Sequence, residues 1–207
     1  MNVLCFGAHP DDVEAGMGAT VRRYTREGHQ VYILSACVPD GLASRRQEAA
    51  KAAAILGASS LYLNLPLEQV SPDIRLITQL DAVAQRIQPD AIYTHWVHDS
   101  HQDHRAVANA AISVARTNQC SVYMYELIPS GIVPEAFRAQ RYVDVTEQFA
   151  FKIESIRAHQ TQLARIGKPW PRGLDGLAAF RGFQIGVRYA EAFEVVREIV
   201  PAGRPMF

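Results

Sequence analysis

The chain of 207 residues predicts a single α/β domain, in which helices cover both faces of a mainly parallel sheet. Short apolar runs alternate with helical segments through residues 1–127, and the boundaries between them carry glycine or proline. Hydrophobic residues make up 48% of the chain and charged residues 20%, as in a soluble globular protein. These observations predict a three-layer sandwich.

The elements follow one another in order. Five apolar runs are predicted strands: Val3–Gly7, Gln30–Cys37, Ser60–Leu65, Asp90–His95 and Cys120–Leu127. Four helical segments separate them: Val13–Arg26, Ser44–Leu56, Pro72–Ile87 and Asp103–Thr117. Gly28 and Gly57 stand where glycine commonly ends a helix, and a loop is expected around Asp40.

The pattern changes from residue 128 onwards. Arg141–Val145 is a candidate strand, and Phe149–Arg165 is a predicted helix. Pro169–Gly186 contains several glycines and prolines, which indicates a loop with some helix. Ala190–Val200 fits a helix or a strand equally well. Because no linker or repeat is visible, we predict one domain over 1–207, with a core at 1–127 and a C-terminal elaboration at 128–207.

Charge and cysteine content narrow the range of partners. The 21 basic and 21 acidic residues balance, which argues against nucleic acid or a membrane surface as the partner. No apolar stretch is long enough to span a bilayer, and no signal peptide is expected. The three cysteines, Cys5, Cys37 and Cys120, are widely spaced, so buried reduced thiols and a cytoplasmic location are expected.

Polar segments follow three of the predicted strands. His9, Asp11 and Asp12 come after the first, residues 40–45 after the second, and residues 95–104 after the fourth. In parallel α/β sheets, ligands bind beyond the carboxyl ends of the strands. We therefore expect the three segments to converge on a site at that edge.

The third segment is rich in metal-ligating side chains: His95, His98, His101, His104, Asp99 and Asp103. Alone it could also be a solvated loop. The first segment favours a site, because it supplies one imidazole and two carboxylates within four residues. Catalytic zinc takes such donors, keeps three protein ligands and leaves one position for water. The residues thus predict metal-assisted hydrolysis.

Adjacent aspartates allow two roles to be divided. One carboxylate binds the metal, while the other acts as general base towards the attacking water. The tetrahedral intermediate also needs its oxyanion stabilised, for which a protonated histidine oriented by a carboxylate is suited. His101 and Asp103, beside His104, are placed for that pairing.

Five segments, in order along nearly the whole chain, resemble motifs of the LmbE-like, or PIG-L, deacetylases. His-Pro-Asp-Asp alone is weak support, but all five together are specific. The segments are Ala8–Thr20, Arg45–Gly57, His101–His104, His159–Gln162 and Tyr189–Phe193.

The resemblance implies a Rossmann-like fold and zinc-dependent N-deacetylation, commonly of an N-acetylglucosamine derivative, as in the bacillithiol and mycothiol pathways. By position, three residues resemble the family's zinc ligands: His9, Asp12 and His104. Asp11 resembles the general base, His101 the oxyanion-stabilising or acid histidine, and Asp103 its orienting partner. Arg45 resembles an arginine that contacts substrate at the rim. The family also implies a homo-oligomer, either a hexamer or a trimer.

The chain departs from the family at a few places. Gln102 stands where proline is usual, but the flanking His101 and Asp103 are kept. Thr161 replaces a usual serine, which concerns only a minor contact near the site. The chain is also short for the family, so loops that shape substrate choice are expected to be trimmed.

Several residues keep two interpretations. Arg45 could instead pair with Glu48 at i+3 on a helix surface. Asp99 either orients a ligand histidine or caps a turn, and Glu191, in an apolar stretch, needs a charged or hydrogen-bonded partner. His95 and His98 are expected in a loop or at the rim of the site, and not as ligands. His159 is either close to the site or a buried core histidine. Glu14 is either a favourable first-turn acid or a site residue.

Other functions fit parts of the pattern. One is hydrolysis of a different amide, such as a thiol conjugate or an antibiotic intermediate. Another is magnesium-dependent phosphoester hydrolysis, against which the histidines argue because magnesium prefers oxygen ligands. A non-catalytic metal-binding protein is the third, and the presence of Asp11 and His101 beside the ligands argues against it.

Overall fold

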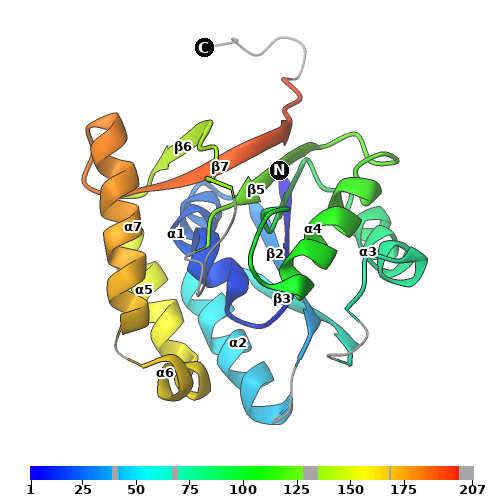
Figure 1. Cartoon of the computed structure of the whole chain (residues 1–207), viewed down its shortest axis with the longest axis horizontal. Coiled ribbons are helices and arrows are strands. Elements are labelled where there is room, and N and C mark those ends of the chain that lie inside the picture. The colour runs from blue at the N-terminus through cyan, green and yellow to red at the C-terminus, as the bar shows by residue number, and fades with distance from the viewer. Residues whose placement is uncertain (39–41, 67–69, 128–134, 168, 201–207) are drawn as a thin grey trace.

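A twisted sheet forms the centre of the computed structural model, which describes residues 1–38, 42–66, 70–127, 135–167 and 169–200 (Figure 1). Within these ranges the sheet has seven strands in the order β3-β2-β1-β4-β5-β7-β6. The first five strands are parallel, whereas β7 runs antiparallel to both β5 and β6. Their bounds are Asn2–Gly7 for β1, Gln30–Cys37 for β2, Ser59–Leu65 for β3, Ala91–Thr94 for β4, Ser121–Tyr125 for β5, Arg141–Asp144 for β6 and Ala190–Arg197 for β7. The predicted mainly parallel α/β sheet is confirmed.

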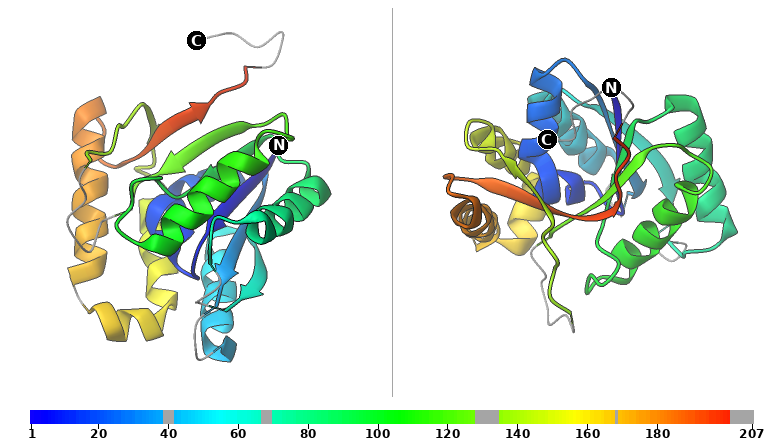
Figure 2. Two further views of the ribbon diagram at one scale, coloured as in Figure 1. Left: turned by 45° about the vertical axis from the view of Figure 1, so that its right-hand side comes forward. Right: turned by 90° about the horizontal axis from the view of Figure 1, so that it is seen from above.

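Helices cover both faces of this sheet (Figure 2). One face carries α1, α2 and α5, and the other carries α3 and α4. The helix α7 packs against β7 and β6 at the end of the sheet (Figure 2). The bounds are Asp12–Arg26 for α1, Leu42–Leu56 for α2, Ile74–Ile87 for α3, Gln102–Val114 for α4, Phe149–Ala158 for α5, Gln160–Ile166 for α6 and Pro169–Ile185 for α7.

The alternation of side chains along β1 explains the two apolar cores. Leu4 and Phe6 point to the face covered by α3 and α4, whereas Val3 and Cys5 point to the face covered by α1 and α2. All four side chains are fully buried, as expected for a central parallel strand with a helix layer on each side. The three cysteines are buried and form no disulfide, which confirms the expectation of buried thiols.

The C-terminal part differs from the sequence expectation in two places. The predicted helix over 149–165 is broken at His159, which ends α5 and precedes α6. The segment expected to be mostly loop is instead the helix α7 of 17 residues. Its prolines, Pro169 and Pro171, lie in the first turn, where their missing N–H groups cost no hydrogen bond.

A contact near the end of α7 explains why glycine is used inside this helix. A Cβ on Gly182 would lie 2.7 Å from the carbonyl oxygens of Val187 and Arg188, so glycine is needed for the chain to fold back closely. The ambiguous stretch that follows is a strand, β7, because it pairs with β5 on one side and β6 on the other.

The position of β1 fixes where a ligand can enter. Its neighbours are β2 on one side and β4 on the other, so the chain reverses its direction of winding at β1. The connections diverge there, and α/β proteins commonly bind their ligands beyond the carboxyl ends of the strands at such a point. Among the described residues, no helix has both the length and the apolar character needed to cross a bilayer.

Candidate active site

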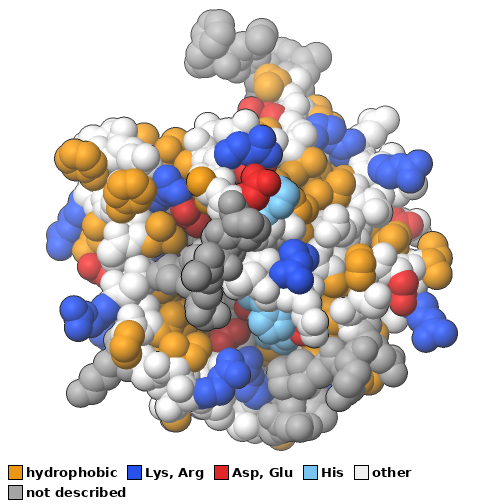
Figure 3. Space-filling model, in the orientation of Figure 1, with side chains coloured by type: hydrophobic (Ala, Val, Ile, Leu, Met, Phe, Trp, Pro, Cys, Tyr) orange, Lys and Arg blue, Asp and Glu red, His pale blue; other side chains and the backbone are white. Residues whose placement is uncertain are grey.

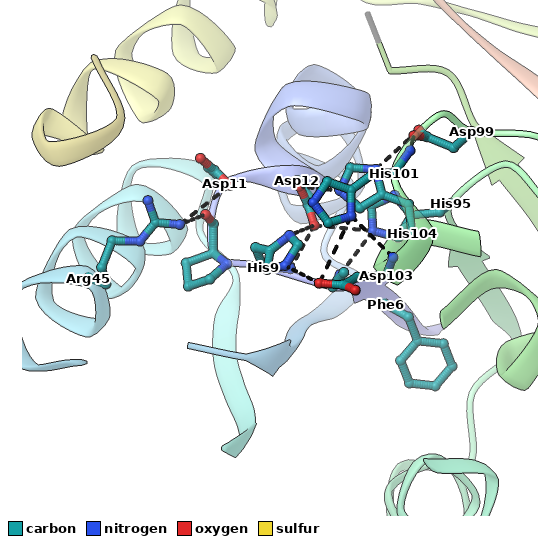
Figure 4. A network of polar contacts seen from close by, with 12 residues as sticks. Phe6, His9, Asp11, Asp12, Arg45, His95, Asp99, His101, Asp103 and His104 are labelled. Carbon is teal, nitrogen blue, oxygen red and sulfur yellow. Dashed lines mark hydrogen bonds and ion pairs between the residues drawn. The ribbon is translucent and has the colours of Figure 1, made fainter. Parts of the chain in front are cut away.

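Side chains from three segments meet at the carboxyl ends of β1 and β4 (Figure 4). Residues 8–11 connect β1 to α1, residues 95–101 connect β4 to α4, and α2 contributes Arg45. The convergence expected from the sequence is therefore present for the first and third polar segments and for Arg45. The expected loop around Asp40 lies outside the described residues.

Asp12 lies at the centre of an imidazole cluster. Its Oδ1 lies 3.4 Å from Nε2 of His104, and its Oδ2 lies 3.6 Å from Nδ1 of His9. The backbone N–H of His9 donates to Oδ2 at 2.7 Å, which holds the carboxylate under the loop. Burial would raise the pKa of Asp12, but the neighbouring His104 and His95 outweigh it and keep this pKa well below its usual range.

His104 is held between two carboxylates. Besides the contact with Asp12, its Nδ1 lies 3.1 Å from Oδ2 of Asp99. Burial lowers the pKa of His104, but Asp12 and Asp99 reverse that effect and raise it to about 10. Asp99 thus makes the contact expected of a carboxylate that orients a histidine, which is one of the two interpretations left open by the sequence. It also accepts the N–H of His101 at 2.8 Å.

Asp103 and His101 lie at the beginning of α4. His101 precedes the helix, and its Nδ1 accepts the N–H of Asp103 at 3.1 Å. The Asp103 carboxylate lies 2.9 Å from Nε2 of His9 but 3.9 Å from Nδ1 of His101. Its nearer imidazole is thus His9. The His101 side chain is 48% exposed, in contrast to the buried residues around it.

Asp11 lies on the other side of the loop, away from the imidazole cluster (Figure 4). It precedes α1 in a left-handed conformation with φ of 107°, unusual for an aspartate, and is buried. Burial, followed by the charge of Asp12, raises the pKa of Asp11 to about 8. The two adjacent aspartates therefore have separate surroundings, as the proposed division of roles requires.

Arg45 is buried and does not lie at an exposed rim. Its side chain donates to the carbonyl oxygen of Pro10 at 2.8 Å and lies 3.7 Å from Oδ1 of Asp11. The alternative of an i+3 pair with Glu48 is not seen, since Glu48 binds the N–H and hydroxyl of Thr161 at 2.9 and 2.6 Å. The residue at the position of the usual serine therefore still makes a contact, through its hydroxyl.

His95 was expected in a loop or at the rim, but the structure buries it completely beneath the site. Its ring stacks on the His104 ring, with 4.0 Å between the two ring centroids. Its Nε2 lies 3.2 Å from Oδ2 of Asp12. The N–H of Ala8 donates to the same Nε2 at 2.9 Å. Its position at the end of a predicted buried strand is the sequence feature from which its burial could be inferred.

Two further residues interact electrostatically with Asp11. His159 is fully buried, and its Nε2 lies 3.4 Å from Oε1 of Glu14 on α1. Burial would lower the pKa of His159, but Glu14 raises it. Both residues therefore belong to the surroundings of the site. The His98 ring instead contacts the Trp96 ring, with 5.2 Å between the two ring centroids.

The residues present match the needs of a zinc ion. Atoms of His9, Asp12 and His104 that can bind a metal lie within 4.8 Å of one another. Two imidazoles and one carboxylate form a usual donor set for catalytic zinc. Asp103 and Asp99 contact the other ring nitrogens of the two histidines, as carboxylates around zinc sites commonly do. Overlapping groups also exist, namely His9-His101-Asp103 and His95-Asp99-His104.

The site reaches the surface on the face shown in Figure 3. Histidine side chains are visible there in a hollow, with acidic side chains at its edge and basic side chains nearby (Figure 3). His101, whose side chain is 48% exposed, is the most exposed member of the cluster.

Known sequences support an amide-cleaving enzyme. The family model described as PIG-L, GlcNAc-PI de-N-acetylase, matches residues 4–115. An uncharacterized deacetylase, YaiS from Escherichia coli, is 30% identical over 77% of this chain and 90% of its own length. A diacetylchitobiose deacetylase from Thermococcus kodakarensis is 26% identical over 94% of this chain and 82% of its own.

Solved structures share the fold. The conserved protein TT1542 from Thermus thermophilus superposes with a TM-score of 0.85 at 22% identity, covering 98% of this chain and 99% of the other. GalB, a 4-carboxy-2-hydroxymuconate hydratase from a Pseudomonas, superposes with a TM-score of 0.81 at 19% identity over 99% of both chains. The fold by itself thus does not decide the reaction.

Proposed function

The chain belongs to the PIG-L family of de-N-acetylases, and on that premise we propose that it is a zinc-dependent hydrolase that removes an acetyl group from an amide nitrogen. The substrate is an N-acetylglucosamine derivative. The family model for GlcNAc-PI de-N-acetylase and the diacetylchitobiose deacetylase among the relatives support this class. A cytoplasmic location and a homo-oligomer of three or six chains remain predictions.

One observation carries the proposal: the two adjacent aspartates have different surroundings. Asp12 contacts His9 and His104, whereas Asp11 faces Arg45. His9, Asp12 and His104 would hold the zinc, which supplies a lowered pKa for water and polarisation of the acyl carbonyl. Asp11 is then free to handle a proton.

Side chains of the protein carry out the proton transfers and stabilise the oxyanion. The Asp11 carboxylate accepts a proton from the attacking water, whose oxygen bonds to the acyl carbon. His101 donates from Nε2 to the oxyanion, because its Nδ1 accepts the N–H of Asp103 and its proton therefore lies on Nε2. As the C–N bond breaks, Asp11 returns its proton to the amine nitrogen. Acetic acid and a free amine leave.

Asp103 supports two histidines in this scheme. Its backbone N–H fixes the His101 ring, and its carboxylate contacts Nε2 of His9. Arg45 donates to the carbonyl oxygen of Pro10 and lies beside Asp11, so it would contact a substrate from a buried position next to Asp11.

A substrate panel tests the proposal. Zinc-loaded protein is incubated with N-acetylglucosamine, its glycosides, N,N′-diacetylchitobiose and non-sugar N-acetyl amides, and the released amine is measured with a fluorogenic reagent. We expect release from the sugars first. Preference for the non-sugar amides would favour the alternative amide hydrolase, and no release from any compound would end the proposal. A phosphate monoester with magnesium serves as a separate arm.

A further inference from the structure

The helix α1 is interrupted one turn after the candidate site. Met17 has φ of −145° and ψ of 24°, which are not helical values. The break separates a first turn, which carries Asp12 and Glu14, from the rest of α1. The orientation of the first turn is therefore not set by the long part of the helix.

A buried carboxylate lies where the second part of the helix begins. Glu191, in β7, accepts the N–H of Ala19 at 3.2 Å through Oε1 and that of Thr20 at 2.6 Å through Oε2. These N–H groups are at the start of the new helical segment, where donors need partners from outside the helix. A negative charge there is also favoured by the helix dipole.

A lysine neutralises this carboxylate. Nζ of Lys152, from α5, donates to Oε1 of Glu191 at 2.6 Å, and both side chains are at least 95% buried. The partner that the sequence required for Glu191 is thus Lys152 together with the α1 backbone. A buried ion pair is a poor source of stability compared with apolar packing, so a role in selecting one backbone arrangement is the better explanation.

The opposite side of the first turn is held by an aromatic ring. A Cβ on Gly16 would lie 2.3 Å from Cδ2 of Tyr125, so the turn rests directly on this ring. The Tyr125 hydroxyl donates to the carbonyl oxygen of Phe6 in β1 at 2.8 Å. The first turn of α1 therefore contacts the Tyr125 ring of β5 and ends at the break, after which Glu191 binds the N–H groups of the helix.

We propose that Glu191 and Lys152 are positioning residues, which hold the break in α1 and thereby place Asp11 and Asp12 at the carboxyl end of β1. The inference rests on the proposed function for its kinetic consequence, but not for its consequence for metal binding. Neither residue touches the imidazole cluster in the contacts that the structure describes, so both act through the helix.

Two double variants separate positioning from stability. Lys152→Met with Glu191→Leu removes both charges and every acceptor, and Lys152→Met with Glu191→Gln keeps one carbonyl acceptor for the α1 N–H groups. Because both variants remove the charge pair together, neither leaves a buried charge unpaired. Glu198→Gln is the matched control, since it breaks an ion pair with Arg141 just after the same strand but at the far end of the sheet.

The readouts are zinc affinity by chelator competition, kcat and KM, each on protein shown to be folded by circular dichroism. For the leucine variant we expect zinc affinity to fall by about tenfold or more, and kcat to fall similarly with KM within about twofold. The glutamine variant should lie between it and the wild type, and Glu198→Gln should match the wild type.

Wild-type zinc affinity in the folded leucine variant, or equal losses in the leucine and glutamine variants, would overturn the inference. Should the leucine variant not fold, wild-type zinc affinity and kcat in the glutamine variant would do the same. If zinc affinity changes as expected but the wild type cleaves no acyl amide, the proposed function fails and the positioning role stands.

Discussion

The carboxylate of Asp103 lies 2.9 Å from Nε2 of His9 and 3.9 Å from Nδ1 of His101. The sequence pairs Asp103 with the neighbouring His101, but the closer imidazole comes from the loop after β1. Asp103 therefore connects α4 to the loop that carries His9, a proposed zinc ligand, and we expect its loss to affect metal binding as well as turnover.

The first prediction concerns Asp103→Asn. An amide orients His9 less strongly than a carboxylate, so zinc affinity should fall by about 10- to 100-fold. The backbone N–H that fixes His101 is unchanged in this variant. Chelator competition gives the affinity, and His101→Gln is the comparison, because it should lower kcat by roughly 100-fold or more with zinc affinity retained. Unchanged zinc affinity in Asp103→Asn would restrict Asp103 to the His101 side of the site.

The second prediction separates the two aspartates. Asp11→Asn should keep its zinc but lose about 100- to 10,000-fold in kcat, because the general base is removed while the ligands stay. His104→Ala is the opposite case and should lose zinc, since a ligand is removed. Metal analysis and steady-state kinetics on the same preparations test both. Full turnover by a zinc-loaded Asp11→Asn enzyme would refute its role as base.

The third prediction uses two helical glycines. Gly16→Ala should lower the free energy of unfolding by about 1–3 kcal/mol, because its Cβ would collide with the Tyr125 ring. Gly176→Ala is the matched control, since a Cβ there meets nothing within 4 Å. It should raise the stability by about 0.5–1 kcal/mol through better helix propensity. Urea unfolding measures both, and equal effects of the two substitutions would contradict the contact.

The fourth prediction concerns pH. Burial lowers the pKa of His159, but Glu14 outweighs it and raises this pKa above the ordinary value of 6.5, with Asp11 acting in the same direction as Glu14 and Arg45 against it. A raised pKa in the folded state means that protonation of His159 stabilises the fold below pH 6.5. This contribution is lost as the pH rises through the raised pKa. The stability difference between wild type and His159→Gln, from urea unfolding, should therefore shrink from pH 6 to pH 9. A difference that stays constant or grows over this range would contradict the pair with Glu14.

Much of the fold could be predicted because buried strands and helices have characteristic patterns of apolar residues in the sequence. The apolar run at the start of the chain is a fully buried strand, and its histidine and aspartates follow the strand end as predicted. The segment of α7 is predicted from the sequence to be a loop with some helix, because glycine and proline weaken helix propensity. There the prolines lie in the first turn, and Gly182 is required by the neighbouring backbone.

What the sequence determined by itself is the set of chemical groups and the order in which strands deliver them to one edge of the sheet. The tertiary structure alone decided the partners: Asp103 with His9, His95 beneath Asp12, and Glu191 with Lys152 behind the break in α1. The reason is physical. Periodicity along the chain records whether a side chain is buried, whereas the partner of a buried polar group is set by contacts between segments about 40 to 170 residues apart.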